Sequence, residues 1–485
     1  MRDARIRAIW AILALCACGA PEVPNEPAPT TEGPGPRPPV VLITIESLRT
    51  DHVGAYGGSS RTQPAVAITP TLDALAREAV VYERAHSVTS WTLSSHASLF
   101  TGLYPTAHQT RQPMARLGAD YTTLAERLSE VGYQTAAVVS GPYLRNAYNL
   151  TQGFDRVDES SANPIQPRAH QDITNPGMEA GLIRFIERER DPDRPFFLFA
   201  YFWDPHFDFL PPEPYASMFL DDDSEQIDVR NFDTGNAIHP GISTAELEFV
   251  IAQYDGEIRA TDELLGRFFG LLRQRGLWSD SLVIVTADHG EEFFDHGEKG
   301  HKKNLHAETV RVPLLVKYPK GRGGRPGSRD ERLVSLVDVA PTVLEFAGAA
   351  PAEPVHGRSL LSEPDADRAI FFELLSSWYV RRAGKTIAEI EDWSGIRVGD
   401  RKLLKHRGKI SYFDLATDPT EQNDLSAQRR EDVEVLSALL ADQRQQSVQD
   451  AARFEHGGTA DLEAEATEQL CALGYLRCPD SESSD

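Results

Sequence analysis

The chain has 485 residues, 41% of them hydrophobic, and carries 49 basic against 73 acidic residues, a formal net charge of −24. Its length predicts one large core domain with a smaller one beside it. The acidic excess argues against a nucleic-acid partner and predicts a soluble surface that repels itself.

Residues 1–18 have the pattern of a targeting segment. Three arginines among the first seven residues precede the apolar stretch Ala8–Leu15, which is too short to span a bilayer as a helix. A leucine three residues before Cys18, with a small residue directly before the cysteine, resembles the lipobox of bacterial lipoproteins. Cys16 fits less well, because a leucine would then occupy the cleavage position. We expect export to the bacterial periplasm or cell envelope with a lipid on Cys18 that anchors the protein to the membrane. Simple secretion is the alternative.

Residues 19–38 are rich in Pro, Glu and Thr and contain almost nothing to bury, so we expect an extended tether. The two cysteines outside the targeting segment, Cys471 and Cys478, lie close together near the chain's end. In an exported protein such neighbours can form a local disulfide. No cysteine falls near a potential active site.

From Pro39 onward, apolar β-branched runs alternate with amphipathic stretches, a pattern typical of an α/β sandwich with a largely parallel sheet. Helices are expected at Thr71–Arg77, Ser94–Phe100, Tyr121–Val131 and Ala245–Arg275. Buried strands are expected at Val40–Ile45, Thr135–Val139, Phe196–Phe202, Ser281–Thr286 and Val312–Val316.

The pattern changes after about Pro364. Short antiparallel strands are expected at Ala369–Leu374, Gly395–His406 and Lys409–Tyr412, followed by a terminal helix at Glu431–Gln445. We therefore expect a large catalytic domain over residues 39–364, a smaller C-terminal subdomain over 365–478 and a tail over 479–485.

Acidic residues and histidines directly follow three of the expected strands. Glu46 follows the first strand, Asp204 and His206 follow Phe196–Phe202, and Asp288 with His289 follows Ser281–Thr286. Ligands of open α/β sheets bind at the carboxyl ends of strands. Carboxylates and imidazoles that converge there suit a divalent cation such as Zn²⁺ or Mn²⁺. The alternative is that each cluster is a helix cap or a turn.

Six segments in order resemble one known family. They are VVLITIESLRTDHVGAYG, TPTLDALAREAVVYERAHSVTSWTLSSHASLFTGLYPTAH, FFLFAYFWDPH, VTADHGEEFFDHG, VRVPLLVKYP and LVSLVDVAPTVLEFAGAAPAEPVHGRSLL, and YFDLATDPTEQNDL follows them in the C-terminal subdomain. Together they resemble the sulfatase family of the alkaline phosphatase superfamily. The resemblance implies an alkaline-phosphatase-like sandwich and a hydrolase that acts on anionic sulfate or phosphate esters.

The resemblance departs from the usual sulfatase motif at the nucleophile. Sulfatases carry C/S-x-P-x-R, whose Cys or Ser is oxidised to formylglycine, whereas this chain has Thr92, Ser94 and His96 at the three fixed positions. Threonine is not a known substrate of that oxidation, so we expect no formylglycine. The family's aspartate pair after the first strand is Glu46-Ser47 here.

These departures match other members of the superfamily. Phosphoglycerol and phosphoethanolamine transferases attack with an unmodified threonine, and the phosphoglycerol enzymes hold one Mn²⁺ with Glu, that Thr, Asp and His. The resemblance thus implies one divalent ion (Mn, Zn or Ca) held by Glu46, Thr92, Asp288 and His289. A divalent cation lowers the pKa of a coordinated alcohol, and a helix start favours an alkoxide and an anionic ester. The alternative is that Thr92 is only an N-cap, a role that Ser94 could also fill.

Five further residues match family positions near the pocket. His206 is expected to contact the ester or protonate the leaving group, since imidazole suits general acid catalysis. His301 and Lys302 are expected to bind the anionic substrate. His96 replaces an arginine that holds the nucleophile, and His108 matches a histidine near the pocket, although single histidines are more often structural.

The sequence therefore predicts an exported, metal-dependent sulfatase-family enzyme that cleaves or transfers a phosphate or sulfate ester at Thr92. Two alternatives stay open. One is a true sulfatase without formylglycine, and the other is an inactive binding protein that kept the fold.

Overall fold

The computed structural model describes residues 37–162 and 174–476, apart from positions 223, 231, 234, 383, 384 and 474. The targeting segment, nearly all of the tether, Cys478 and the tail lie outside the described residues. Arg37–Asp485 form one compact unit. Among the described residues, no helix is long and apolar enough to cross a membrane.

A sheet of eight strands lies at the centre of this unit, in the order β10-β2-β9-β6-β1-β5-β3-β4. All neighbours pair in parallel except β9, which runs antiparallel to both β2 and β6. The predicted α/β sandwich with a mostly parallel sheet is confirmed. The strands are β1 Val40–Ile45, β2 Val80–His86, β3 Gln134–Ser140, β4 Arg156–Ser161, β5 Phe196–Phe202, β6 Leu282–Ala287, β9 Leu314–Lys317 and β10 Arg329–Ser335.

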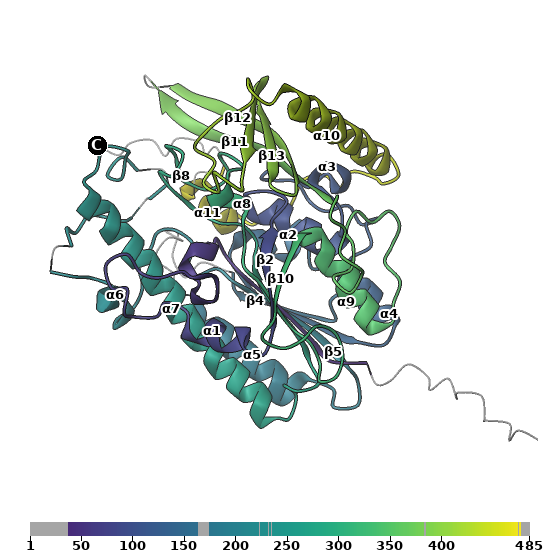
Figure 1. Cartoon of the computed structure of the whole chain (residues 1–485). Helices are drawn as coiled ribbons and strands as arrows, with labels where there is room; N and C mark the ends of the chain where they lie inside the picture. Colours follow the sequence, from purple (N-terminus) through teal and green to yellow (C-terminus); the bar gives the residue numbers. More distant parts are fainter. Residues whose placement is uncertain are drawn as a thin grey trace, which may run out of the picture. The chain divides into compact units, whose positions relative to one another are not determined.

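Helices cover both faces of this sheet (Figure 1). Helices α1 (Pro70–Ala76), α5 (Asn175–Arg184) and α7 (Thr244–Gln274) pack together on one side. Helices α2 (Thr92–Thr101), α4 (Leu124–Glu130) and α9 (Val339–Ala347) pack together on the other side. Three short helices lie in connecting segments, and they are α3 Pro105–His108, α6 Tyr215–Met218 and α8 Ala307–Val310.

Strands β1, β5 and β6 are fully buried along their lengths, as their uninterrupted apolar sequences predict. They lie side by side in parallel, and Ile45, Phe202 and Ala287 are paired at the same level. The residues that directly follow these three strands therefore start from one edge of the sheet. This register brings together side chains that lie up to about 240 positions apart, such as Ser47 and Asp288.

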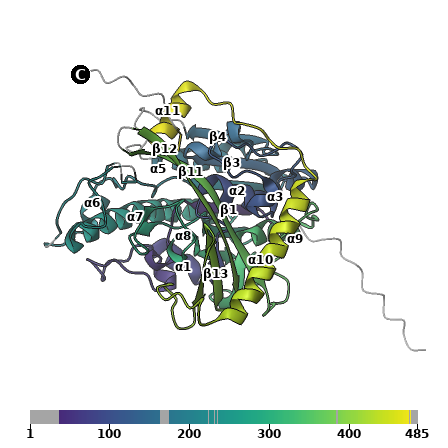
Figure 2. The ribbon, with the colours of Figure 1, turned by 90° about the horizontal axis from the view of Figure 1, so that it is seen from above.

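The C-terminal part forms a separate antiparallel sheet of four strands with α10 packed against it (Figure 2). The strands are β11 Ala369–Arg382, β12 Lys385–Val398, β13 Arg401–His406 and β14 Lys409–Asp414. The expected single strand over Gly395–His406 is wrong. The chain turns at Gly399, whose φ of 59° lies in the left-handed region that favours glycine, so the segment is split between β12 and β13.

The helix expected at the C-terminus is α10, Arg430–Ala451, but it is not terminal. It is followed by α11, Ala464–Ala472, which leads the chain back to the main sheet's side and contacts the Pro142–Leu144 turn. Cys471 in α11 is disulfide-bonded.

Candidate active site

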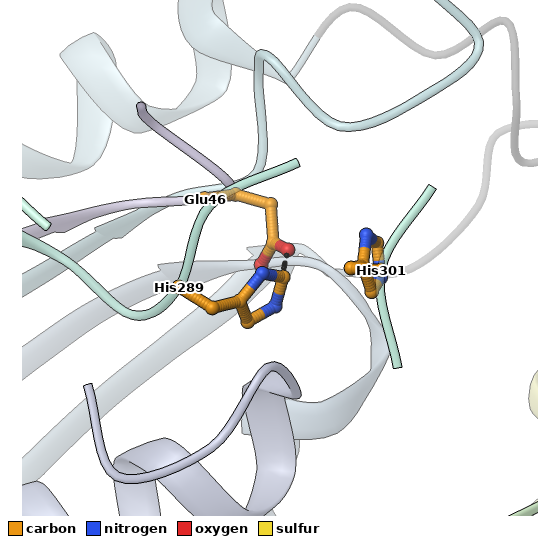
Figure 3. A group of neighbouring side chains, drawn as sticks. All are labelled: Glu46, His289 and His301. Carbon is orange, nitrogen blue, oxygen red and sulfur yellow. Dashed lines mark ion pairs between the residues drawn. The ribbon is translucent and has the colours of Figure 1, made fainter. Parts of the chain in front are cut away.

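Three side chains meet directly beyond the ends of β1 and β6 and at the start of α2. The Thr92 hydroxyl donates toward both carboxylate oxygens of Glu46, at 3.2 and 3.3 Å, and lies 3.2 Å from Nε2 of His289. Nε2 of His289 lies 3.1 Å from Oε1 of Glu46. All three side chains are fully buried. Glu46 and His289 point toward one another in Figure 3, and His301 lies beside them, with its ring centroid 4.5 Å from that of His289.

Thr92 is the first residue of α2, and its N-cap residue Trp91 has extended backbone and no side-chain capping bond. The free N–H groups of the first turn therefore lie beside the Thr92 hydroxyl, and no acidic residue occupies that turn. A ten-residue helix with this start stabilises negative charge on the hydroxyl or on a bound anion. The N-cap reading of Thr92 is wrong, because the residue lies inside the helix and its hydroxyl bonds to Glu46.

The orientation of His289 is set by its neighbour in the chain. Nδ1 of His289 donates to the carbonyl of Gly290 at 2.9 Å, so Nε2 faces Glu46 and Thr92. Asp288 accepts hydrogen bonds from the backbone N–H groups of Ser47 and His289, at 3.2 and 3.0 Å, through Oδ1. Its Oδ2 lies 3.5 Å from Nε2 of His289. Four potential ligand groups from three distant segments thus converge at one point.

The buried charges of this group shift one another's pKa values. Burial alone would raise the pKa of Glu46, but the nearby His289 holds it well below its usual range. Burial and the neighbouring Glu46 raise the pKa of Asp288 well above its usual value. Burial opposes charging of His289, but Asp288 and Glu46 raise its pKa to about 10. The buried carboxylates therefore favour the protonated form of His289.

These residues fit a divalent cation. Glu46, His289 and His301 each offer a ligand atom, and the three atoms lie within 4.8 Å of one another. Within the described part of the chain, Oδ2 of the buried Asp288 has no hydrogen-bond partner, so it is available as a further donor. Oxygen and imidazole nitrogen donors suit Mn²⁺ and Zn²⁺. Divalent binding would replace the proton on His289 and neutralise the remaining carboxylate charge.

Tyr201 of β5 adds a contact that the sequence did not reveal. Its hydroxyl donates to Oε2 of Glu46, and both groups are buried. The family motif often has a histidine at this position. Tyr201 orients the Glu46 carboxylate toward Thr92 and His289, as partners of metal ligands generally do.

His206 lies beyond the end of β5 and faces the same group. Its ring stacks on Trp203 at 3.7 Å between ring centroids, and Nδ1 donates to the carbonyl of Phe207 at 2.5 Å. Nε2 lies 3.1 Å from the hydroxyl of Tyr475. Tyr475 also lies 3.1 Å from Nε2 of His301, whose Nδ1 contacts Glu291 at 3.1 Å. The two imidazoles expected to act on the ester therefore face one shared point.

Lys302 supplies a buried cation beside this point. Its Nζ lies 4.5 Å above the ring of Trp91 and 4.6 Å above the ring of Tyr475. Within the described residues, the ammonium group has no hydrogen-bond partner, although the side chain is only 3% exposed. Burial lowers the pKa of Lys302 to about 7, and the more distant Asp233 acts in the opposite direction. Such a group is suited to an anionic ligand.

Comparison with known proteins decides the family. Residues 38–349 match the Sulfatase family, and residues 295–449 match the C-terminal family of N-sulphoglucosamine sulphohydrolase. The chain belongs to the sulfatase family. This confirms the prediction of a sulfatase-family hydrolase of sulfuric or phosphoric esters, a family whose members generally bind a divalent metal.

Relatives within this family cover most of the chain. A multifunctional alkaline phosphatase superfamily protein, PehA, of Trinickia caryophylli is 26% identical over 80% of this chain and 91% of its own length. An arylsulfatase of Clostridium perfringens is 25% identical over 83% of this chain and 94% of its own. The phosphonate monoester hydrolase of Agrobacterium radiobacter has the same fold, with a TM-score of 0.66 and 23% identity, over 85% of this chain and 96% of its own.

Two further histidines predicted near the pocket, His96 and His108, lie behind the group rather than in it. Nε2 of His96 bonds with Thr44 at 2.9 Å and Nδ1 with the carbonyl of Thr92 at 2.9 Å, so His96 supports the first turn of α2. Burial lowers the pKa of His96 to about 4. His108 bonds with Ser98 at 3.0 Å and accepts from the Thr110 N–H at 3.1 Å. Both ring nitrogens of each histidine are therefore engaged in structural contacts.

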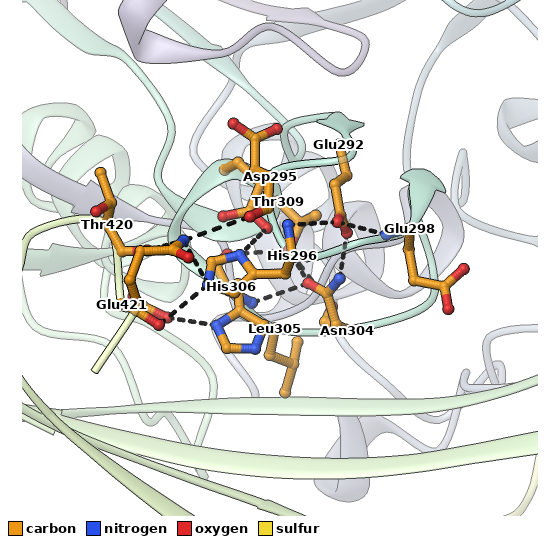
Figure 4. Close-up of polar contacts among 12 residues, drawn as sticks. Glu292, Asp295, His296, Glu298, Asn304, Leu305, His306, Thr309, Thr420 and Glu421 are labelled. Carbon is orange, nitrogen blue, oxygen red and sulfur yellow. Dashed lines mark hydrogen bonds and ion pairs between the residues drawn. The ribbon is translucent and has the colours of Figure 1, made fainter. Parts of the chain in front are cut away.

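His301 and Lys302 lie on the loop between strand β8 (Lys299–Gly300) and α8, and β8 pairs with strand β7 (Glu292–Phe293). A polar network holds this loop in place (Figure 4). Asn304 donates to Glu292, and the carbonyl of Asn304 accepts from Ser90 at 2.7 Å. His306 contacts Glu421 of the C-terminal part at 2.9 Å, and Glu421 pairs with Lys402 at 2.6 Å. The small sheet thus helps to position the loop.

Proposed function

We propose that this protein is a metal-dependent hydrolase of phosphate esters, and of sulfate esters less readily, that forms a covalent intermediate on Thr92. One observation carries the proposal. The Thr92 hydroxyl lies at a helix start, 3.2 to 3.3 Å from Glu46 and His289, and the Lys302 ammonium group lies 4.5 Å over the ring of the adjacent Trp91. An inactive binding protein would not need a hydroxyl in that place.

The residues that would hold the ion are Glu46, Asp288, His289 and Thr92, with His301 as an additional donor. A divalent ion bound there would lower the pKa of the Thr92 hydroxyl and withdraw charge from an ester oxygen. Tyr201 would keep Glu46 in place. His289 is turned toward the group by its bond to the Gly290 carbonyl.

The chain's own residues account for each bond that changes. The oxygen of Thr92 attacks phosphorus or sulfur, and its proton passes to Glu46, which already accepts from it. The bond to the leaving-group oxygen breaks, and the leaving oxygen takes a proton from Nε2 of His206. Water, deprotonated by His206, then attacks the central atom of the threonine ester. Thr92 leaves with the proton returned by Glu46.

The lone hydroxyl of threonine favours phosphate over sulfate. A hydrated formylglycine has a second hydroxyl that can expel the transferred group, whereas an ester of Thr92 is released only by attack at phosphorus or sulfur. Lys302 and the free N–H groups at the start of α2 would bind the anionic oxygens. This arrangement suits a phosphodiester or phosphomonoester.

The test is turnover by protein that begins near Pro36, loaded in turn with Mn²⁺, Zn²⁺ and Ca²⁺. The substrates are nitrophenyl phosphodiester, phosphomonoester and sulfate, with Thr92→Ala and Thr92→Ser beside the parent protein. Thr101→Ala, the same change at the far end of α2, is the control. We expect phosphoester turnover that disappears in Thr92→Ala and persists in Thr101→Ala. Equal turnover by Thr92→Ala would contradict the proposal.

A further inference from the structure

The proposed catalytic group is closed off from solvent. Thr92 and His289 are 0% exposed, and His206 and His301 are 4% and 3% exposed. An ester can reach the Thr92 hydroxyl only if a covering element moves. The position of that element decides which esters are accepted.

Tyr475 is the covering residue that lies deepest in the site. Its hydroxyl lies between Nε2 of His206 and Nε2 of His301, 3.1 Å from each. Its ring packs against Tyr143, with 5.2 Å between centroids, and under the ammonium group of Lys302. A phenol oxygen therefore occupies the point where the two imidazoles and the cation would meet an ester.

The segment that carries Tyr475 and the other walls of the site are held by different contacts. The loop of His301 and Lys302 is fixed by the network around Asn304, and the turn of His206 is tied to the end of β5. The segment from α11 to Leu476 is the last described part of the chain. It is held by the disulfide bond of Cys471, by a hydrogen bond from Arg145 to Gln469 at 2.7 Å, and by buried leucines of α11 and the residue after it.

We propose that Tyr475 is a specificity-determining gate, which an ester must displace from His206 and His301 before it reaches Thr92, so that esters with bulky leaving groups are disfavoured. The proposal rests on the proposed function, in which His206 faces the leaving group. It assigns the control of access to Tyr475, which lies shortly after helix α11.

The first test compares full-length Tyr475→Phe and Tyr475→Ala with the parent protein on a nitrophenyl phosphate and on the bulkier methylumbelliferyl phosphate. Tyr475→Phe removes the hydroxyl that competes with substrate, so we expect KM to fall about fivefold for both esters with kcat nearly unchanged. Tyr475→Ala also removes the ring and should favour the bulkier ester further. Tyr148→Phe, a buried tyrosine whose ring contacts Tyr143, is the matched control and should change neither constant.

A rise in KM or a fall in kcat for Tyr475→Phe would overturn the proposal, because Tyr475 would then assist the ester rather than compete with it. Melting temperatures check whether Tyr475→Ala folds. If Tyr475→Ala does not fold, Tyr475→Phe still tests the proposal, because this variant keeps the aromatic ring.

A second readout needs no turnover. Diethyl pyrocarbonate modifies accessible imidazoles, and the exposed His239 serves as the internal reference. We expect His206 and His301 to react faster, relative to His239, in Tyr475→Ala than in the parent protein. Equal reaction would overturn the gate. Absence of turnover with every ester would contradict the proposed function alone, since the modification experiment still decides the question of access.

Discussion

Replacing Lys302 by methionine should make the protein more stable and less active. Lys302 is a buried cation, without a hydrogen-bond partner among the described residues, in a site that we assign to an anionic ester. Methionine has a similar size and no charge. It keeps the same Cβ at the left-handed φ of 69°, so backbone strain is common to both proteins.

The size of the effect follows from the pKa of Lys302. Burial lowers it from 10.5 to about 7. At about 1.4 kcal/mol for each pKa unit, the burial of this charge costs on the order of 4 kcal/mol near neutral pH. In Lys302→Met, loss of the cation–π contacts with the rings of Trp91 and Tyr475 offsets about 1 to 2 kcal/mol of this gain in stability. We expect Lys302→Met to gain about 2 kcal/mol in the free energy of unfolding.

The pH dependence has a definite sign. Because folding lowers the pKa of Lys302, the unfolded chain binds the proton more tightly between about pH 7 and the unfolded value of 10.5. The stability of the parent protein should therefore rise with pH over this interval relative to Lys302→Met. The difference between the two proteins should close toward pH 10.5.

The assay is urea unfolding at pH 7 and pH 10, with and without inorganic phosphate. Lys320→Met, at an exposed lysine, is the control and should change stability little. Phosphate should stabilise the parent protein and not Lys302→Met, because a ligand stabilises only the form that binds it. The variant should lose about 10- to 100-fold in kcat/KM. A variant no more stable than the parent, with equal stabilisation by phosphate, would refute the reasoning.

Three further predictions concern the groups around the site. Glu421→Gln breaks the buried pair with Lys402 and should lower the free energy of unfolding by about 3 to 5 kcal/mol at pH 7 in urea titrations. Burial alone would raise the pKa of Glu421, but Lys402 and His306 lower it to about 2. The stability that the ionised Glu421 contributes is therefore present above about pH 4.5 and is lost as the pH falls toward 2. A stability difference between Glu421→Gln and the parent protein that is unchanged at pH 2 would contradict this prediction. His206→Gln should lower kcat about 10²- to 10⁴-fold for alkyl esters and less for nitrophenyl esters, and equal losses would exclude a general acid. Tyr201→Phe should weaken Mn²⁺ binding about 10-fold in calorimetric titrations, and unchanged binding would remove its link to Glu46.

The centre of the fold was predictable because its strands are buried on both faces. Strands β1, β5 and β6 have uninterrupted apolar sequences, and parallel pairing then places Glu46, Asp288 and His289 at one edge. Strands β2, β4 and β10 were missed, and of these β4 and β10 lie at the sheet's margins. Their exposed positions carry charged residues, which interrupt the apolar run.

The site was predictable only where a residue type carries chemistry by itself. Carboxylates and histidines at strand ends indicated Glu46 and His289, whereas the resemblance to the sulfatase family indicated Thr92. Nothing in the sequence near the chain's end indicates that Tyr475 reaches the site, because its contacts with His206 and His301 span 269 and 174 positions. The contact of Tyr201 with Glu46 was not predicted either, because a tyrosine in a buried strand is expected to be a residue of the hydrophobic core.

Detection of an ester on Thr92 is the most direct test of the account. The metal-loaded protein, and His206→Gln as a variant that should release the group slowly, would be mixed with excess nitrophenyl phosphodiester and quenched in acid. Mass spectrometry of the peptide that contains Thr92 should then show on Thr92 an added phosphoryl group that still carries the second alcohol of the diester, in an amount approaching one per active site. Turnover with no modified Thr92, or with the group on another residue, would contradict the central claim.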